Sequence, residues 1–324
     1  MNFFAYRDPA GHTRIFSSER ILPGLHPGGF VIAPFTPGFG EPETIPADTE
    51  LQDIPEIDLR KIHAGLYFPA YSTTREEHRH AVTTIIDSLS RLPVRGKAIS
   101  ARVLMRPLST GLREMFRRLC ESYPTAFVFT FYSDSTGLWI GATPETLLEI
   151  DSNRLHTMAL AGTRPSGSIG EWDEKNLEEQ EIVSKYIFNI LNTNGLNPVL
   201  GKRHTKSAGP VEHICTEIEA DVPADLTSLL RELSPTPALG GYPRDVALRL
   251  IDKTEDFRRF LYGGYIGPYL SPGRLQLYVN LRSGCIADGR IALYAGGGIT
   301  PLSNPDAEWL ETERKLSTML SILS

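Results

Sequence analysis

Apolar residues repeat at helical spacing in several stretches of the chain. In the first, residues 72–92, they recur every three or four positions, and Thr73 with Glu76 fits a capping box at its start. Asn304 followed by Pro305 is typical of a helix N-terminus and predicts a final helix from that point. The same spacing predicts further helices over residues 109–122, 177–191, 224–232 and 244–252.

Short apolar and β-branched runs predict strands between these helices. The runs are residues 98–104, 126–132, 138–150, 155–161, 276–281 and 290–294. Residues 1–60 are rich in glycine and proline and indicate only short edge strands and loops. Neighbouring strands interspersed with helices favour an α+β fold over a regular βαβ winding. No low-complexity linker follows residue 60, so we expect one domain over residues 1–324.

Composition narrows the class of protein. The chain has 324 residues, 41% hydrophobic and 22% charged, which is ordinary for a globular protein. Its net charge of -6, without a basic cluster, argues against nucleic acid as a partner. No apolar run is long enough to span a membrane, and the N-terminus lacks a signal-peptide pattern. Three scattered cysteines form neither a zinc motif nor an even disulfide set, so we expect a cytoplasmic protein.

The stretch 296–320 combines a glycine cluster with two acidic residues on the final helix. Glu308 and Glu311 are three positions apart, so their carboxylates share one helical face. Beside a glycine-rich turn they suggest oxygen ligands for a hard cation. On this stretch alone we favour the simpler interpretation, a solvated acidic face in which Glu311 pairs with Lys315.

Seven sequence motifs resemble those of the chorismate-utilising enzymes and occur in the same order as in that family. The family includes isochorismate, salicylate, anthranilate and aminodeoxychorismate synthases. The resemblance covers about residues 96–324, as a catalytic core, and is weak over residues 1–95. The motifs are GATPE (141–145), LAGTRP (160–165), EKNLEEQEIV (174–183), SPTPALGGYPR (234–244), RRFLYGGYIG (258–267), YVNLRSG (278–284) and YAGGGITPLSNPDAEWLETERK (294–315).

The resemblance implies an α+β fold in which two large antiparallel sheets pack face to face with helices outside. It also implies chorismate as the substrate and Mg²⁺ as the cofactor. Glu179 and Glu311 match the metal ligands, and Glu308 would support the ion through water. Without the resemblance, Glu179 would be interpreted as a surface charge between Glu178 and Glu181.

The same resemblance assigns substrate contacts. Arg282 would hold a substrate carboxylate, because a guanidinium offers a bidentate fork. Tyr262 and backbone N–H groups in two loops and the glycine cluster are further candidates, since glycines allow close approach to a small dianion. These backbone positions are Gly162, Thr163, Ala238, Leu239 and Gly297.

Two residues indicate which reaction of the family this sequence resembles. Lys97 falls where the water-activating members carry their lysine base, and Glu145 matches the general acid that protonates the departing C4 hydroxyl. Lys97 can act as a base only if desolvation depresses its pKa; alone, it would be interpreted as a solvated lysine after a loop glycine. Ala161 stands where aminodeoxychorismate synthases carry a nucleophilic lysine.

These residues predict an isochorismate synthase, an isomerase that needs no glutaminase partner. Menaquinone biosynthesis is the preferred pathway over siderophore biosynthesis. A salicylate synthase, an amine-forming anthranilate or aminodeoxychorismate synthase component, and a non-catalytic chorismate-binding relative are the alternatives. Ser166, Gln180 and Ser234 depart from the family pattern without removing a proposed catalytic group.

Overall fold

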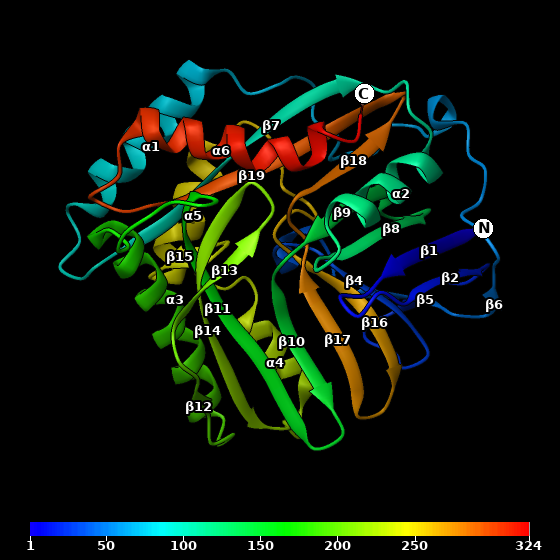
Figure 1. The fold of residues 1–324 in the computed structure, drawn as a ribbon, viewed down its shortest axis with the longest axis horizontal. Coiled ribbons are helices and arrows are strands. Elements are labelled where there is room, and N and C mark those ends of the chain that lie inside the picture. Colours follow the sequence, from blue (N-terminus) through cyan, green and yellow to red (C-terminus); the bar gives the residue numbers. More distant parts are fainter. Residues whose placement is uncertain (324) are drawn as a thin grey trace.

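The computed structural model describes residues 1–323 as two large sheets with helices on their outer faces (Figure 1). Each described pair of strands is antiparallel. In spatial order the first sheet contains β15 (Gly241–Tyr242), β7 (Lys97–Pro107), β19 (Arg290–Ile299), β18 (Ser283–Ala287), β9 (Gly137–Thr143), β8 (Phe127–Ser133), β1 (Asn2–Arg7), β2 (Thr13–Ser18) and β6 (Thr49–Glu50).

The second sheet carries most of the remaining strands, and one further strand, β13 (His204–Ala208), pairs with its β14. Its spatial order is β12 (Val199–Leu200), β14 (Val211–Asp221), β11 (Arg154–Pro165), β10 (Thr146–Asp151), β17 (Arg274–Val279), β16 (Tyr265–Ser271), β4 (Gly29–Ala33), β5 (Glu43–Pro46) and β3 (Leu22–Pro23). The α+β fold with two antiparallel sheets is therefore confirmed.

Aromatic side chains fill the space between the two sheets. Phe127 of β8 stacks on Tyr278 of β17 with ring centroids 4.0 Å apart, and Phe4 of β1 stacks on Phe30 of β4 at 5.0 Å. Rings of this size bury a large apolar area each, and stacked pairs add about 0.5–1.5 kcal/mol beyond that burial. The face-to-face packing thus rests on pairs contributed by opposite sheets.

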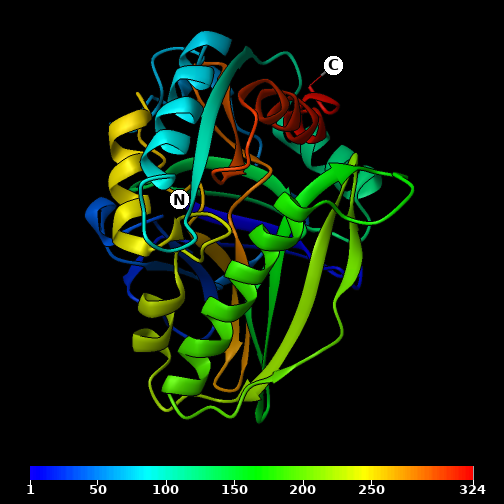
Figure 2. The same ribbon diagram turned by 90° about the vertical axis from the view of Figure 1, so that its left-hand side faces the viewer.

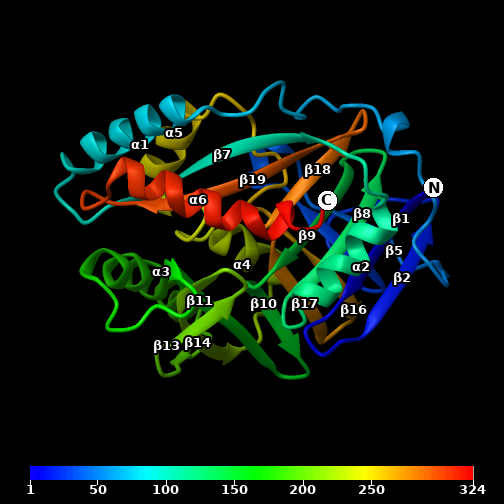
Figure 3. The same cartoon turned by 45° about the horizontal axis from the view of Figure 1, so that its top comes forward.

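Six α-helices cover the outer faces of the sheets in the described part of the chain. They are α1 (Arg75–Leu89), α2 (Leu112–Ser122), α3 (Glu174–Thr193), α4 (Leu226–Leu233), α5 (Arg244–Thr254) and α6 (Pro305–Leu320), with short 3-10 turns η1 (Pro37–Phe39) and η2 (Leu59–Lys61). α1 and α5 pack together against β7 (Figure 2). α2 and α6 cover the first sheet (Figure 3), and α3 and α4 cover the second. None of these helices is long and apolar enough to cross a bilayer.

The expected helices are present, but details at the start of α1 differ. The capping box uses Thr74 and Glu77, one position later than predicted. Thr73 is occupied elsewhere, because its hydroxyl accepts a hydrogen bond from the Val103 N–H at 3.1 Å. The final helix begins as predicted, with the Asn304 side chain capping it and Pro305 in its first turn.

The prediction for residues 1–60 was wrong in one respect. β1 lies inside the first sheet, between β8 and β2, and β4 lies inside the second, between β16 and β5. Every residue of these two strands is buried, because each strand is covered on both faces. Strands buried on both faces lose the alternation that marks a strand in sequence.

The predicted strand over residues 138–150 was also wrong, because it is two strands in different sheets. β9 ends at Thr143, and β10 begins at Thr146 in the opposite sheet. Pro144 lies in the gap, and proline has no N–H to continue a ladder. Strands β14, β16 and β18 were not predicted at all.

Candidate active site

Two crossovers between the sheets lie side by side and carry two of the predicted site residues. Glu145 lies between β9 and β10, and Arg282 lies between β17 and β18. The Val279 N–H donates to the Glu145 carbonyl at 3.0 Å, and the Ala142 N–H donates to the Arg282 carbonyl at 3.1 Å. The crossovers therefore hold each other in place at the junction of the two sheets.

Glu145 is a carboxyl group almost removed from water, with 4% of its surface exposed. Burial raises its pKa to about 8, although the charge of Lys97 opposes the rise. A carboxyl group with this pKa is mostly protonated at neutral pH. It can therefore donate a proton to a leaving group, as a general acid must.

Arg282 anchors a chain of hydrogen bonds that includes a histidine the sequence analysis missed. Its Nη1 donates to Thr318 Oγ1, and its Nη2 donates to His213 Nε2, each at 3.1 Å. His213 Nδ1 in turn donates to the Gly162 carbonyl at 2.8 Å. Because a guanidinium only donates, the imidazole is neutral with its proton on Nδ1. Burial, with Arg282 adding to it, lowers the pKa of His213 to about 3.

The alternating pattern of β14 was the one signal that could have identified His213. Its side chain shares a strand face with Cys215, because residues two apart point the same way. Since no strand was predicted over this segment, the histidine was not considered. The Arg282 side chain is buried and lines a cavity, and its role in substrate binding stays a prediction.

Three carboxylates converge over the glycine cluster of β19. A Cβ placed on Gly297 would lie 3.0 Å from Glu308 Oε2 and 3.3 Å from Glu311 Oε1. A Cβ placed on Gly298 would lie only 2.1 Å from Glu179 Oε1. The glycines thus leave the space that α3 and α6 fill with acidic side chains. Glu308 and Glu311 are buried, so the expected solvated acidic face was wrong, whereas the expected pair of Glu311 with Lys315 is present.

Lysine side chains from three segments lie against these carboxylates. Lys97 Nζ lies 3.0 Å from Glu179 Oε1, and Lys315 Nζ lies 2.7 Å from Glu311 Oε1. Lys175 bridges two helices, with Nζ 3.0 Å from Glu308 and 3.5 Å from Glu179. Burial would raise the pKa of Glu179, but the ion pairs outweigh it and hold that pKa at about 2. Lys175 was not predicted as a site residue.

Lys97 is fully buried, so the interpretation of this residue as a solvated lysine was wrong. Burial lowers the pKa of its ammonium group, and Glu179 opposes that shift. The contact with Glu179 is close but is not aligned as a hydrogen bond, so the N–H groups of Lys97 have no aligned acceptor. A desolvated ammonium with unfilled donors loses a proton more readily than one in water.

A cavity of about 570 Å³, including its open mouth, joins these groups. Eight predicted residues line it: Glu145, Gly162, Thr163, Glu179, Ala238, Leu239, Tyr262 and Arg282. The other four, Lys97, Gly297, Glu308 and Glu311, are not part of its lining. Lys97 lies next to the wall, since its Cε would be 2.8 Å from a Cβ on Gly298. The cavity thus brings Glu145, Glu179 and Arg282, from three separate segments, to one space.

Three of the backbone donors expected to contact substrate are already engaged. The Leu239 N–H donates to the Thr236 carbonyl at 3.0 Å. The Thr163 N–H donates to Asn176 Oδ1 at 2.8 Å. The Ala238 N–H donates to Thr236 Oγ1 at 3.3 Å. These loops therefore shape the cavity wall, and their amides are not free donors in this structure.

Comparison with known proteins identifies the family. A family model described as chorismate binding enzyme matches residues 71–324. The chain belongs to the chorismate-binding enzyme family. It is 31% identical over 221 residues to isochorismate synthase EntC of Escherichia coli strain K12, covering 64% of this chain and 56% of EntC. It is 30% identical over 277 residues to isochorismate synthase MenF of the same strain, covering 78% of this chain and 63% of MenF.

A solved structure of the menaquinone-specific isochorismate synthase MenF from Escherichia coli has the same fold. Its TM-score is 0.81 at 20% sequence identity, covering 100% of this chain and 89% of that one. In the sequence alignments, this member of the family spans between half and two thirds of the length of these curated relatives.

The departures from the family's motifs have local hydrogen-bond partners in this chain. The buried Gln180 side chain donates to Thr216 Oγ1 at 2.8 Å, which joins α3 to β14. The Ser234 carbonyl accepts a hydrogen bond from Arg244. Ser166 lies at the surface, where its N–H donates to the Pro210 carbonyl at 3.1 Å. None of the three contacts involves Lys97 or Glu145.

The carboxylate cluster has the donor chemistry of a site for a hard divalent cation. Glu308 Oε2 is buried and has no hydrogen-bond partner, so one anionic oxygen is unused. Burial, with Glu311 adding to it, raises the pKa of Glu308 to about 7. Carboxylate oxygens over a glycine cradle fit Mg²⁺, which takes one or two protein carboxylates and keeps several waters.

Proposed function

We propose that this protein is an isochorismate synthase, which converts chorismate to isochorismate by adding a hydroxyl group at C2 and losing the one at C4. The observation that carries the proposal is a pair of buried groups beside one cavity, the Lys97 amine and the Glu145 carboxyl. Burial shifts the pKa of each toward its neutral form. A neutral amine and a protonated carboxyl are the base and the acid that this reaction needs.

Each side chain has a distinct task in the proposed reaction. Lys97 Nζ removes a proton from the attacking water, whose oxygen bonds to C2. Glu145 gives its proton to the C4 oxygen, which leaves as water while both ring double bonds shift by one position. Atoms balance, because one water enters and one leaves. Arg282 would hold a substrate carboxylate with its guanidinium fork.

Glu179 and Glu311 would hold Mg²⁺ directly, and Glu308 would hold it through water. The ion, when bound, would neutralise a substrate carboxylate and stabilise negative charge near the ring. The unpartnered Glu308 oxygen supports this assignment. Tyr262, buried beside Gly296, would close one wall around the substrate.

Water as the nucleophile removes the need for ammonia, so the proposed enzyme works without a glutaminase partner. Menaquinone biosynthesis remains the expected pathway. Restored menaquinone in a strain that lacks its own isochorismate synthase would test the pathway.

The direct test incubates the purified chain with chorismate and Mg²⁺ and separates the products by chromatography. We expect isochorismate, with no change when ammonium is added. Lys97→Ala and Glu145→Gln should each lose turnover while keeping the circular dichroism of the parent. Salicylate as the final product, anthranilate formed with ammonium, or a fully active Lys97→Ala variant would overturn the proposal.

A further inference from the structure

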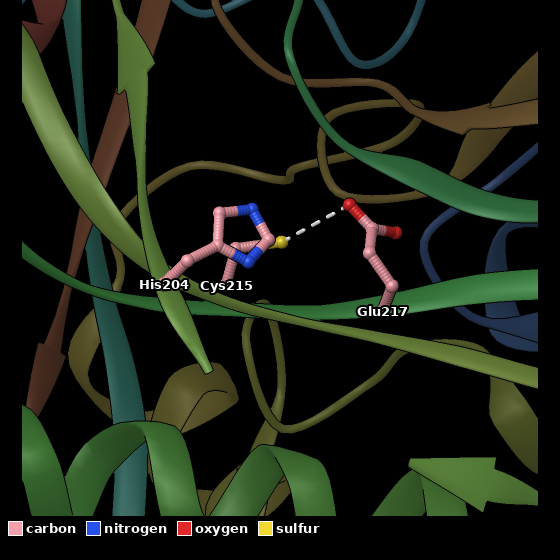
Figure 4. A group of neighbouring side chains, drawn as sticks. All are labelled: His204, Cys215 and Glu217. Carbon is pink, nitrogen blue, oxygen red and sulfur yellow. Dashed lines mark hydrogen bonds between the residues drawn. The ribbon is translucent and has the colours of Figure 1, made fainter. Parts of the chain in front are cut away.

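A second cluster of potential ligands lies on β13 and β14, apart from the carboxylates of the proposed active site. His204 of β13 is directly opposite Cys215 of β14 in the antiparallel register. Glu217 is two residues further along β14, so its side chain projects from the same face as Cys215. Figure 4 shows the three side chains converging. One ligand atom from each lies within 4.8 Å of the other two.

The distances suit a tetrahedral metal ion. Cys215 Sγ lies 3.5 Å from Glu217 Oε1. Sulfur and oxygen ligands at the usual zinc bond lengths are about 3.5 Å apart in a tetrahedral site. No backbone change is needed to bring this pair to ligand spacing. The His204 side chain is exposed, so its rotation can bring the imidazole to the ion.

The histidine is prepared for coordination by its second nitrogen. His204 Nδ1 lies 3.2 Å from the carbonyl of Lys202, which can accept its proton. That hydrogen bond leaves Nε2 with a free lone pair. Metal-binding histidines commonly donate their other N–H to a backbone carbonyl in this way, because it fixes the tautomer and the ring direction.

The mixture of donors points to one class of cation. A thiolate, an imidazole and a carboxylate together favour Zn²⁺ or a similar borderline-soft ion over Mg²⁺, which prefers oxygen alone. His204 and Glu217 are exposed, whereas Cys215 is buried at the base of the cluster. An ion could therefore enter from solvent and keep one water ligand.

Two neighbours shape the site. Met158 pairs with Glu217 across β11 and β14, so its thioether lies on the same face as a further soft donor. Lys206 Nζ lies 3.5 Å from the Met158 sulfur, and its positive charge would repel a bound cation. Lys206 is only partly buried, so its flexible side chain can swing toward water when an ion binds.

We propose that His204, Cys215 and Glu217 form a binding site for one Zn²⁺ ion, separate from the proposed magnesium site. The site uses a thiol that the proposed reaction does not need. It shares a strand face with His213, two residues before Cys215, so it lies next to the substrate cavity without lining it.

The test titrates the intact protein with Co²⁺ in excess Mg²⁺, which occupies the carboxylate site. We expect one Co²⁺ per chain, a sulfur-to-cobalt charge-transfer band, visible bands typical of tetrahedral cobalt, and displacement of the ion by Zn²⁺. His204→Ala should weaken Co²⁺ binding by more than about 10-fold. Changing a residue that only hydrogen-bonds to a metal ligand already costs about 10-fold or more in affinity, and removing the ligand itself should cost more. Cys215→Ser should abolish the charge-transfer band.

Cys120→Ser is the matched control, because it removes a thiol from α2 and should leave the spectrum unchanged. Lys206→Met should tighten binding, since it removes the opposing charge. If Cys215→Ser fails to fold, the exposed His204→Ala and Glu217→Gln variants still test the site. Absence of the charge-transfer band, or Co²⁺ affinity unchanged in both His204→Ala and Glu217→Gln, would overturn the proposal.

Discussion

Gly298→Ala is the substitution that tests the arrangement of the site most directly. The glycine lies in β19, between the carboxylate of Glu179 and the side chain of Lys97. Its backbone is outside the left-handed region, so alanine is acceptable to the chain itself. The effect of the methyl group must therefore come from what it contacts.

The structure sets the size of that effect. The new Cβ would lie 2.1 Å from Glu179 Oε1, whereas ordinary contacts begin near 3.4 Å, so the carboxylate must retreat by about 1.3 Å. Lys97 Cε, at 2.8 Å, must also move. Overpacking of this kind costs about 1–3 kcal/mol of stability. A displacement of about 1 Å in a reacting group costs about 100-fold in rate.

We therefore expect kcat/KM for chorismate to fall by about 100-fold or more, while the protein still folds. Product formation is followed by chromatography, Mg²⁺ affinity by calorimetry and folding by thermal melting. Gly65→Ala is the matched control, because Gly65 is exposed and a Cβ there meets nothing within 4 Å. Activity and Mg²⁺ affinity within threefold of the parent in Gly298→Ala would refute the arrangement of Lys97 and Glu179 described above.

Three further predictions concern single groups. Burial raises the pKa of Glu145 to about 8, so the acid loses its proton as pH rises through about 8 and kcat/KM should decline. A kcat/KM that stays flat to pH 10 would contradict the role of Glu145 as the acid. Lys175→Met should lower the melting temperature of the metal-free protein and increase the rise in melting temperature on adding Mg²⁺, since an ion would replace the lost ammonium. Lys185→Met, which removes an exposed ion pair on the same helix, is the control. An equal rise with Mg²⁺ in both variants would argue against this role of Lys175. Arg282→Lys should raise KM by about 10-fold or more, because lysine cannot form the fork, and an unchanged KM would remove Arg282 from substrate binding.

Much of the helical structure followed from the sequence, because amphipathic spacing and end signals are local. α6 begins where Asn304 and Pro305 predicted. The strands were harder to predict from the sequence. β1 and β4 are buried on both faces and resemble loops in a segment rich in glycine and proline. Pairing between strands distant in sequence determines where such segments lie, and no local pattern encodes that pairing.

The site residues could be collected by resemblance, but not their environment. Glu308 and Glu311 match a solvated helix face because two acidic groups one turn apart usually face water. They are buried here because Lys175, from another helix, and Lys315 neutralise them above the glycines of β19. His213 was missed because its strand was missed, and only the fold brings it to Arg282.

Charge balance links the parts of the proposed site. Three carboxylates, two lysines and the buried Arg282 guanidinium carry no net charge together when all six are ionised and Lys97 and Glu145 are neutral. The six are Glu179, Glu308, Glu311, Lys175, Lys315 and Arg282. A divalent cation alone would leave two uncompensated positive charges in a buried site, and a dianionic substrate alone would leave two negative ones. Either imbalance is costly in a region of low dielectric constant.

The same constraint explains why the proposed acid and base are neutral before the reaction. When Lys97 takes a proton from water and Glu145 gives one to the leaving oxygen, one group becomes positive and the other negative. The total charge of the site is therefore unchanged during the step. A buried cavity can support such paired transfers with little reorganisation, whereas a single uncompensated transfer would create the isolated charge that its surroundings stabilise poorly.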